Sequence, residues 1–289
     1  MFTLHNGHCL EVLPSIPSGS IDAIITDLPY GTTACKWDTI IPFEPMWKEV
    51  KRVLKPNGAF ITTASQPFTS ALIMSNPSMF KCEWIWDKEV GNNFATVKYQ
   101  PFKEHENIIV FGQGKTTYNP IKIKRSDYSL KCHPIGSKHL VPSTGKAMAV
   151  NGLVGKPHYM SADGMRNPRS IIVFKPLKGR GKRSPHPTRK PVALYEYLIK
   201  TYTNEGETVL DIAMGSGTTI EAAERTGRNS IGIEKDEGIF QTAVLRLRSL
   251  TPSNNRSHMD AGDSPRQPSQ STLEGFTHAE QGHKPAPRQ

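Results

Sequence analysis

The chain has 289 residues, of which 36% are hydrophobic, and a formal net charge of +10. This length predicts one sizeable core, in a single domain with a large insertion. No apolar stretch approaches the roughly 20 residues that cross a bilayer, and the N-terminus lacks the basic and then apolar layout of a signal peptide, so we expect a cytoplasmic protein without membrane contact. The four cysteines, Cys9, Cys35, Cys82 and Cys132, lack metal-site spacing, which favours reduced structural thiols and no metal.

Strands and helices are predicted to alternate along the chain. Ile21–Thr26 is a continuous apolar run of strand length that ends in turn residues, as in a strand covered on both faces. Further strands are predicted at residues 59–63, 82–86, 107–111, 208–211 and 230–234, and helices at 43–54, 67–74, 191–201, 218–226 and 236–250. This alternation indicates an α/β fold, a doubly wound, mostly parallel sheet with helices on both faces.

The positive charge is concentrated in one segment. Residues 112–190 contain 17 lysines and arginines but only two acidic residues, Asp127 and Asp163, which gives this segment a net charge of +15. Because the whole chain has a net charge of +10, the other residues together have a net charge of −5. A basic insert on an acidic body favours a polyanion, although a merely solvated basic loop is the alternative. Polar side chains between its cations could read base edges. We assign to this polyanion surface the side chains of Lys122, Lys124, Arg125, Lys131, Arg166, Arg169, Arg180 and Arg183.

Domain boundaries follow from these shifts in composition. Residues 1–250 form the predicted globular domain, and it includes a recognition insert at residues 112–185. Residues 251–289 are rich in Ser, Pro, Gln and Gly with balanced charges, so we expect a disordered tail and assign it no chemistry.

The first chemically informative segment is Thr26–Gly31, directly after the strand at 21–26. Asp27, Pro29 and Tyr30 place a carboxylate, a carbonyl and an aromatic ring at the carboxyl end of a buried strand. Such a group can hold a flat, amino-bearing base. A loop-capping aspartate is the plainer alternative. Lys88 is expected at the surface, and the neighbouring Trp84 and Trp86 are expected in the core.

The second segment, residues 210–219, has the pattern of a strand, a glycine turn and a helix start. Gly215 and Gly217 would allow a tight turn and a close approach of the backbone to a ligand. Glu234 ends the next predicted strand, where acidic residues of nucleotide-binding units accept hydrogen bonds from ribose. In open α/β sheets ligands bind beyond the carboxyl ends of the strands, so we expect both segments to share one site.

From about residue 4 to 250, these features resemble the amino-methylating DNA methyltransferases of the beta arrangement, a bacterial and bacteriophage family. The family's catalytic motif is Asp-Pro-Pro-Tyr, which Asp27, Pro29 and Tyr30 match while Leu28 replaces the first proline. Two further segments, His105-Glu106-Asn107 and residues 186–191, also match. Its cofactor motif matches Asp211, Gly215, Ser216, Gly217, Thr218 and Thr219, whereas Ile212 and Ala213 depart from it.

The resemblance implies S-adenosylmethionine as cofactor and double-stranded DNA as partner, allows a homodimer, and suits a restriction-modification setting in a bacterial cell or a phage-infected host. It places Asp211, Met214, Gly215, Ser216, Gly217, Thr218, Glu234, Lys190 and His8 at the cofactor, with His8 standing where relatives carry an aspartate. It also implies base flipping, in which Asp27 and the Pro29 carbonyl accept the two N–H bonds of an exocyclic amine and Tyr30 stacks on the base.

Adenine N6 is the favoured target, because relatives that methylate cytosine N4 more often carry Ser at the position of Asp27. N4-cytosine methylation stays open, as does a catalytically inactive DNA-binding homologue, which the replacements Leu28, Ile212 and Ala213 would suit. RNA or protein amide methylation is a weaker rival. Methylation of cytosine carbon 5 would use a Pro-Cys nucleophile pair, which this sequence lacks.

Overall fold

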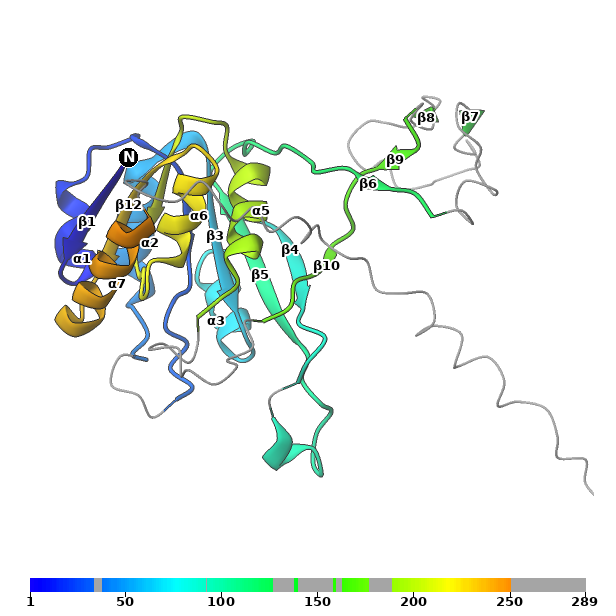
Figure 1. Cartoon of the computed structure of the whole chain (residues 1–289), viewed down its shortest axis with the longest axis horizontal. Helices are drawn as coiled ribbons and strands as arrows, with labels where there is room; N and C mark the ends of the chain where they lie inside the picture. Colours follow the sequence, from blue (N-terminus) through cyan, green and yellow to red (C-terminus); the bar gives the residue numbers. More distant parts are fainter. Residues whose placement is uncertain are drawn as a thin grey trace, which may run out of the picture.

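The computed structural model describes residues 1–33, 38–91, 93–126, 138–139, 158–159, 163–176 and 189–250. Its centre is an eight-stranded sheet with the order β1-β12-β11-β2-β3-β5-β4-β10 (Figure 1). Every pair of neighbours is parallel except that β5 runs antiparallel to both β3 and β4. The strands are β1 Phe2–Asn6, β2 Ile21–Thr26, β3 Leu54–Ala64, β4 Phe80–Asp87, β5 His105–Gly112, β10 Ile171–Val173, β11 Thr208–Asp211 and β12 Asn229–Glu234.

Helices cover both faces of this sheet, as the alternation of elements predicts. The helices are α1 Cys9–Val12, α2 Phe43–Val53, α3 Phe68–Ser75, α5 Val192–Tyr202, α6 Thr218–Arg225 and α7 Glu237–Leu250, with 3₁₀ turns η1 Leu13–Ser15 and η2 Phe94–Thr96. Helices α1 to α3 pack on one face through a core that includes Trp47, Phe60 and Phe111. Helices α5 and α6 bury the other face with Trp84 and Trp86, and α7 packs against α6 and β1.

The alternating side-chain directions of a strand explain how one apolar run serves both cores. In β2, Ile24 belongs to the core under α2, whereas Ala23 and Ile25 belong to the core under α5. A strand covered on both faces is apolar at most positions, and its buried polar side chains need partners. All six residues of β2 are buried, including Asp22, which Lys55 neutralises at 2.7 Å. The interpretation of residues 21–26 is thus confirmed.

All the predicted strands and helices are present, with ends that shift by a few residues. Two strands of the main sheet were missed. β1 pairs with β12 along one edge, and β10 pairs with β4 along the other, both in parallel. Each is short and lies at an edge, so neither shows the long apolar run that marks a central strand.

The strand order also explains why two distant segments can cooperate. Val209 and Leu210 of β11 pair in parallel with Ala23 and Ile24 of β2. Parallel neighbours end at the same edge of the sheet, so the turn after β2 and the glycine turn after β11 lie side by side.

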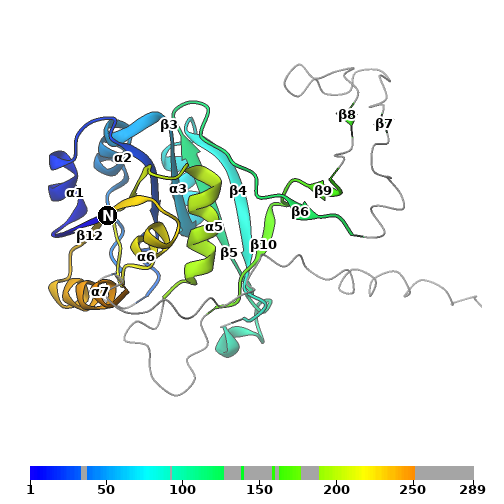
Figure 2. The ribbon, with the colours of Figure 1, turned by 45° about the horizontal axis from the view of Figure 1, so that its top comes forward.

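The described part of the predicted insert forms two small antiparallel pairs away from the main sheet. β6 Ile123–Lys124 pairs with β9 Met165–Arg166, and β7 Lys138–His139 pairs with β8 His158–Tyr159. Figures 1 and 2 both show β6 and β9 beyond the edge formed by β4 and β10. Residues 171–173 of the predicted insert form β10 of the main sheet. Residues 127–137, 140–157, 160–162 and 177–185 of the insert and the predicted tail lie outside the described residues, and the boundaries of the insert and the tail stay predictions. Among the helices of the described residues, none is long and apolar enough to span a bilayer.

Candidate functional site

A cavity of about 690 Å³ lies at the carboxyl edge of the sheet. Both segments singled out from the sequence line it, as the common edge of β2 and β11 requires. The first contributes Asp27, Leu28, Pro29 and Tyr30, and the second contributes residues 211–216 together with Thr218 and Thr219. Of the other predicted site residues, Glu234, Lys190 and His8 also line the cavity.

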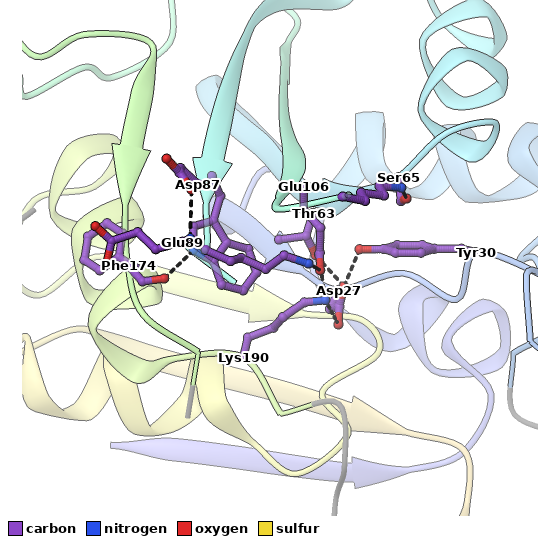
Figure 3. Close-up of polar contacts among 12 residues, drawn as sticks. Asp27, Tyr30, Thr63, Ser65, Asp87, Glu89, Glu106, Phe174 and Lys190 are labelled. Atoms are coloured by element: carbon purple, nitrogen blue, oxygen red, sulfur yellow. Dashed lines mark hydrogen bonds and ion pairs between the residues drawn. The ribbon is translucent and has the colours of Figure 1, made fainter. Parts of the chain in front are cut away.

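Asp27 lies at the centre of a hydrogen-bonded cluster (Figure 3). Its Oδ1 accepts hydrogen bonds from the Tyr30 hydroxyl, at 2.9 Å, and from the Thr63 hydroxyl on β3. Its Oδ2 lies 3.1 Å from Nζ of Lys190. A carboxylate oxygen can accept two hydrogen bonds, so Oδ2 retains a position for a further N–H donor. Phe68 stacks on the Tyr30 ring at 5.2 Å between centroids and fixes that wall of the cavity.

Lys190, which the resemblance assigns to the cofactor, lies at the Asp27 end of the cavity. Its Nζ pairs with Asp27 and with Oε2 of Glu106 at 3.0 Å, and it lies 5.6 Å from the centroid of the Tyr30 ring. Its described partners therefore belong to the Asp27 end of the cavity rather than to the glycine turn. The His186–Pro191 match draws attention to this lysine, but no local pattern indicates that it reaches a carboxylate after β2.

Lys88 is not the surface lysine that the sequence suggests. It is buried at the end of β4, and its Nζ lies 3.2 Å from Oε1 of Glu106. Glu106 thus pairs with both Lys88 and Lys190, and the cluster of Asp27, Glu106, Lys88 and Lys190 contains two carboxylates and two ammonium groups. A buried charge is tolerated when it is paired in this way.

Burial and charge act in opposite directions on this cluster. Burial raises the pKa of Glu106, but the charges of Lys190 and Lys88 outweigh it, and the net pKa lies below the ordinary value. Burial lowers the pKa of Lys190, but the charges of Asp27 and Glu106 raise it by more than burial lowers it, so the net pKa lies above the ordinary value. Lys190 is consequently a fixed cation at neutral pH and not a base. Burial, followed by the charges of Asp27 and Glu106, also raises the pKa of Tyr30, which keeps its hydroxyl proton.

Asp211 lines the cavity, but hydrogen bonds within the turn after β11 occupy both oxygens of its carboxylate. Its Oδ1 accepts from Thr26 at 2.7 Å and from the Ala213 amide at 3.0 Å, and its Oδ2 accepts from Thr219 at 2.5 Å. Burial raises its pKa to about 6, although the Thr219 and Thr26 hydroxyls oppose this shift. The bond from Thr26 joins the ends of β2 and β11 directly.

The glycine turn has the geometry that the sequence predicts. Gly215 and Gly217 have φ of 51° and 78°, in the left-handed region that glycine adopts without steric cost. A Cβ built on Gly215 would meet open space, which leaves its backbone accessible to a ligand. Glu234 accepts from the Gly215 amide at 3.0 Å and from the Asp236 amide at 2.8 Å, one on each carboxylate oxygen. Each oxygen keeps a second acceptor position.

A buried glutamate connects the turn to two other segments, a role that the sequence did not suggest. Glu221 of α6 forms ion pairs with Arg189 at 3.0 Å, with Arg225 at 2.7 Å, and with Arg246 of α7. Arg246 also donates to the carbonyl of Ser216 in the glycine turn. Burial, and then the charge of Arg189, lowers the pKa of Arg246 to about 10, so it remains ionised at neutral pH.

Asp38 is a further residue that sequence reasoning missed. Its carboxylate accepts from the backbone amides of Gly31, Thr32 and Thr33 at 2.8, 2.9 and 2.7 Å, and so holds the chain that follows Tyr30. Burial raises its pKa, but the hydrogen bond from the Thr33 side chain, followed by those from the three amides, outweighs burial and brings the pKa below its ordinary value. The one feature of the sequence that could have indicated this role is an aspartate a few residues after a turn, and that pattern is too common to identify a functional residue.

The remaining predicted cofactor residues lie around the same turn. His8 is the N-cap of α1, where its Nδ1 accepts from the Leu10 amide at 3.3 Å, and it faces the cavity. Met214 is buried, and its amide donates to Ile233 of β12 at 2.9 Å. Among the described residues, no group of three or more His, Cys, Asp or Glu side chains could hold a metal ion.

The cations assigned to DNA divide into three groups. Lys131, Arg180 and Arg183 lie outside the described residues. Lys122, Lys124 and Arg169 are exposed, and Lys122 pairs with Asp163 at 3.0 Å. Arg125 directly follows β6 and is only 2% exposed, so its side chain is buried where Lys124 is exposed, and its assignment to DNA stays a prediction. Burial, followed by the charges of Arg169 and Arg125, lowers the pKa of Arg166.

Comparison with known proteins gives the same interpretation as the geometry. The M.HpaI type II methyltransferase of Haemophilus parainfluenzae is 30% identical over 260 residues, which covers 84% of this chain and 73% of that protein. The M1.MboII type II methyltransferase of Moraxella bovis is 26% identical over 86% of this chain and 96% of its own length.

Solved structures share the fold. The M1.HpyAVI–SAM complex has a TM-score of 0.57 and 24% identity, and it covers 86% of this chain and 99% of that one. PvuII DNA methyltransferase, described as cytosine-N4-specific, has a TM-score of 0.58 and 16% identity, with 88% of both chains covered. The sequence model of the N6_N4_Mtase family, described as DNA methylase, matches residues 21–245. With its motifs in one cavity and this match over most of its length, the chain belongs to the N6_N4_Mtase family of DNA methylases.

Proposed function

We propose that this protein transfers a methyl group from S-adenosylmethionine to the exocyclic N6 amine of an adenine flipped out of duplex DNA. The single observation that carries the proposal is the shared cavity, in which the Asp27 cluster and the glycine turn form two ends of one space. Membership of the DNA methylase family supports the reaction class, and the identity of the base rests on Asp27.

The glycine-turn end has the donor and acceptor groups that S-adenosylmethionine requires. The open space beside the Gly215 backbone would admit the ligand, and Glu234 has a spare acceptor position on each oxygen for ribose hydroxyls. The neighbouring relative M1.HpyAVI was solved as a SAM complex, which supports the same ligand here. When bound, S-adenosylmethionine supplies an electrophilic methyl group on a sulfonium centre.

The Asp27 end would bind and orient the amine. An exocyclic amine is a poor nucleophile because its lone pair is delocalised into the ring. Asp27 Oδ2 and the backbone carbonyl of Pro29 would each accept one N–H, which localises the lone pair on nitrogen and directs it toward the methyl carbon. The N–C bond would form as the C–S bond breaks and the sulfonium leaves as a thioether, and the surplus amine proton would pass to Asp27 Oδ2, which accepts its hydrogen bond, and then to solvent. Tyr30 would stack on the base, a contact worth roughly 1–3 kcal/mol for single-stranded sites.

Lys190 and Glu106 would hold the acceptor in position. Because Lys190 stays cationic, its ion pair holds the Asp27 carboxylate in position, and the second ion pair with Glu106 keeps the Lys190 ammonium group in place when an amine approaches Oδ2. Electrostatic groups fixed before the reaction avoid reorganisation at the transition state. The exposed cations Lys122, Lys124 and Arg169 of the insert favour binding of the phosphate backbone.

The test is transfer of radiolabelled methyl from S-adenosylmethionine to unmethylated DNA, followed by digestion and mass spectrometry of the nucleosides. We expect N6-methyladenine. Asp27→Asn should lower transfer at least about 100-fold, as loss of an aligned transition-state group does, with DNA affinity retained. Glu44→Gln, at an exposed position in the first turn of α2, is the matched control and should be fully active.

Two results would refute parts of this proposal. Undiminished transfer by Asp27→Asn would remove the assigned role of the carboxylate. N4-methylcytosine in the digest would refute adenine as the target base and support cytosine N4 methylation, the second candidate function. The observation that favours this second candidate is the fold shared with the cytosine-N4-specific PvuII enzyme. DNA binding without transfer by the unmodified protein would support an inactive homologue instead.

A further inference from the structure

The loop between β4 and β5, residues 88–104, exposes large apolar side chains next to the cavity. The structure describes all of it except residue 92. Tyr99 is 88% exposed and Phe94 is 71% exposed, and Val97 and Val90 are also exposed. A cluster of exposed apolar side chains in one short segment is a common mark of an interaction site.

The loop is nevertheless internally ordered. Asn93 accepts from the Lys103 amide at 2.8 Å and donates to the Pro101 carbonyl at 3.1 Å, so it ties the two arms of the loop together. The rings of Phe94 and Phe102 pack edge to face at 4.9 Å. At the tip, Gln100 donates to the Thr96 hydroxyl at 2.6 Å, and the Tyr99 amide donates to the Thr96 carbonyl at 2.9 Å. Tyr99 is thus presented on a preformed support, which lowers the entropy cost of binding.

Its position relates the loop to the Asp27 site. β4 is parallel to β2, because β3 is parallel to β2 and both β3 and β4 are antiparallel to β5. The loop therefore leaves the sheet at the edge that carries the cavity, and Figures 1 and 2 both show it extending beyond that edge. Lys103 donates to the Ser65 hydroxyl, and both residues line the cavity together with Lys88.

We propose that the β4–β5 loop is a wedge that enters the base stack beside the flipped nucleotide, with Tyr99 as its inserted ring. Extrusion of a base leaves a gap and costs a few kcal/mol of lost stacking and pairing. Apolar side chains inserted between base steps are a known way to hold a duplex in an opened form. The cationic side chains of Lys98 and Lys103 on the same loop suit the flanking phosphates. This inference rests on the proposed function, since it requires a flipped base in the cavity.

The test compares kcat/KM on two DNA duplexes that contain the site found by sequencing modified DNA. One duplex is fully paired, and the other carries an abasic position opposite the target base, so that flipping no longer breaks a base pair. We expect Tyr99→Ala to lower kcat/KM about 5- to 150-fold on the paired duplex, the range that corresponds to about 1–3 kcal/mol of stacking. On the abasic duplex most of this loss should disappear.

Two further variants separate stacking from other effects. Tyr99→Phe keeps the ring and should remain close to the unmodified protein on both duplexes. Leu245→Ala removes an apolar side chain of α7 that is 69% exposed, and it should change neither rate. Fluorescence of 2-aminopurine at the target position should rise on binding of the unmodified protein and rise less with Tyr99→Ala.

The outcomes distinguish this inference from the proposed function. Transfer by the unmodified protein with no effect of Tyr99→Ala on the paired duplex would overturn the wedge alone. Equal losses on both duplexes would also overturn it, because a merely structural role predicts them. Self-association that Tyr99→Ala abolishes, with unchanged kcat/KM, would assign the surface to a second copy of the chain. No transfer by the unmodified protein on any DNA would overturn the proposed function and the wedge together.

Discussion

The charge balance of the Asp27 cluster can be tested by removing one carboxylate from it. Glu106→Gln keeps the size of the side chain but leaves Lys88 and Lys190 with Asp27 as the one carboxylate of the four-residue cluster. Lys190 keeps its partner Asp27, at 3.1 Å, whereas Lys88 loses the carboxylate with which it pairs at 3.2 Å. The variant therefore buries an uncompensated ammonium group at the end of β4.

The size of the effect follows from the separation and the burial. Two unit charges 3.2 Å apart attract by about 5 kcal/mol at an effective dielectric constant of 20. Desolvation offsets part of this attraction, and removal of one partner from a buried pair costs about 3–5 kcal/mol in practice. We expect Glu106→Gln to lower the free energy of unfolding by about that amount, a large fraction of the stability of a typical domain.

The assay is urea denaturation of the unmodified protein, Glu106→Gln, Lys88→Met and the double variant at neutral pH. Lys88→Met should cost less than Glu106→Gln, because Glu106 retains Lys190. The double variant removes the unpaired cation and should be more stable than Glu106→Gln alone, with a coupling energy of about 0.5–3 kcal/mol. If the two single changes add within about 0.5 kcal/mol, the two side chains do not interact and the reasoning is refuted.

Two further predictions concern the glycine turn. Burial raises the pKa of Asp211 from 3.8 to about 6, so the folded chain holds its proton where the unfolded chain has lost it. Stability should therefore fall as pH rises from about 3.8 to about 6, by up to about 3 kcal/mol from this group. Asp211→Asn lacks this contribution, so the difference in unfolding free energy between the unmodified protein and this variant should change between about pH 3.8 and about pH 6. Urea denaturation at several pH values measures this difference. If the two proteins gave parallel profiles of stability against pH, the assigned role of Asp211 would be wrong. Gly217→Ala should cost at least about 1–2 kcal/mol, because its φ is 78° and the added Cβ would lie 2.9 Å from Leu247 Cδ1. Thermal unfolding measures this loss. The control is Gly206→Ala, because Gly206 has a similar φ of 79° but open space where its Cβ would lie. Equal losses of stability in the two variants would exclude a contribution from the contact with Leu247.

The sequence was most informative where local patterns are strong. Long apolar runs, helix periodicity and glycine turns located the central strands and the helices, and the order of motifs placed Asp27 and Asp211 at one edge. The short edge strands β1 and β10 gave no comparable signal, since edge strands need fewer apolar residues.

The site was predicted in outline but not in its contacts. Lys88 resembled any lysine after a strand, and only the pairing of β4 with β5 brings it to Glu106. Lys190 could be identified from its motif, but its approach to Asp27 depends on tertiary structure across 163 positions. Asp38 and Glu221 likewise act on partners that local sequence does not identify.

The three-residue strand β10 has a consequence for how this protein could vary. It is where the chain rejoins the main sheet after the segment that contains β6 to β9, and its ladder with β4 fixes Ile171 opposite Ile85 and Val173 opposite Asp87. That ladder fixes where the chain returns to the sheet. Insertions, deletions or replacement within the segment from β6 to β9 could therefore be absorbed without displacing β10, so that segment and the cavity at the carboxyl edge of the sheet could vary separately.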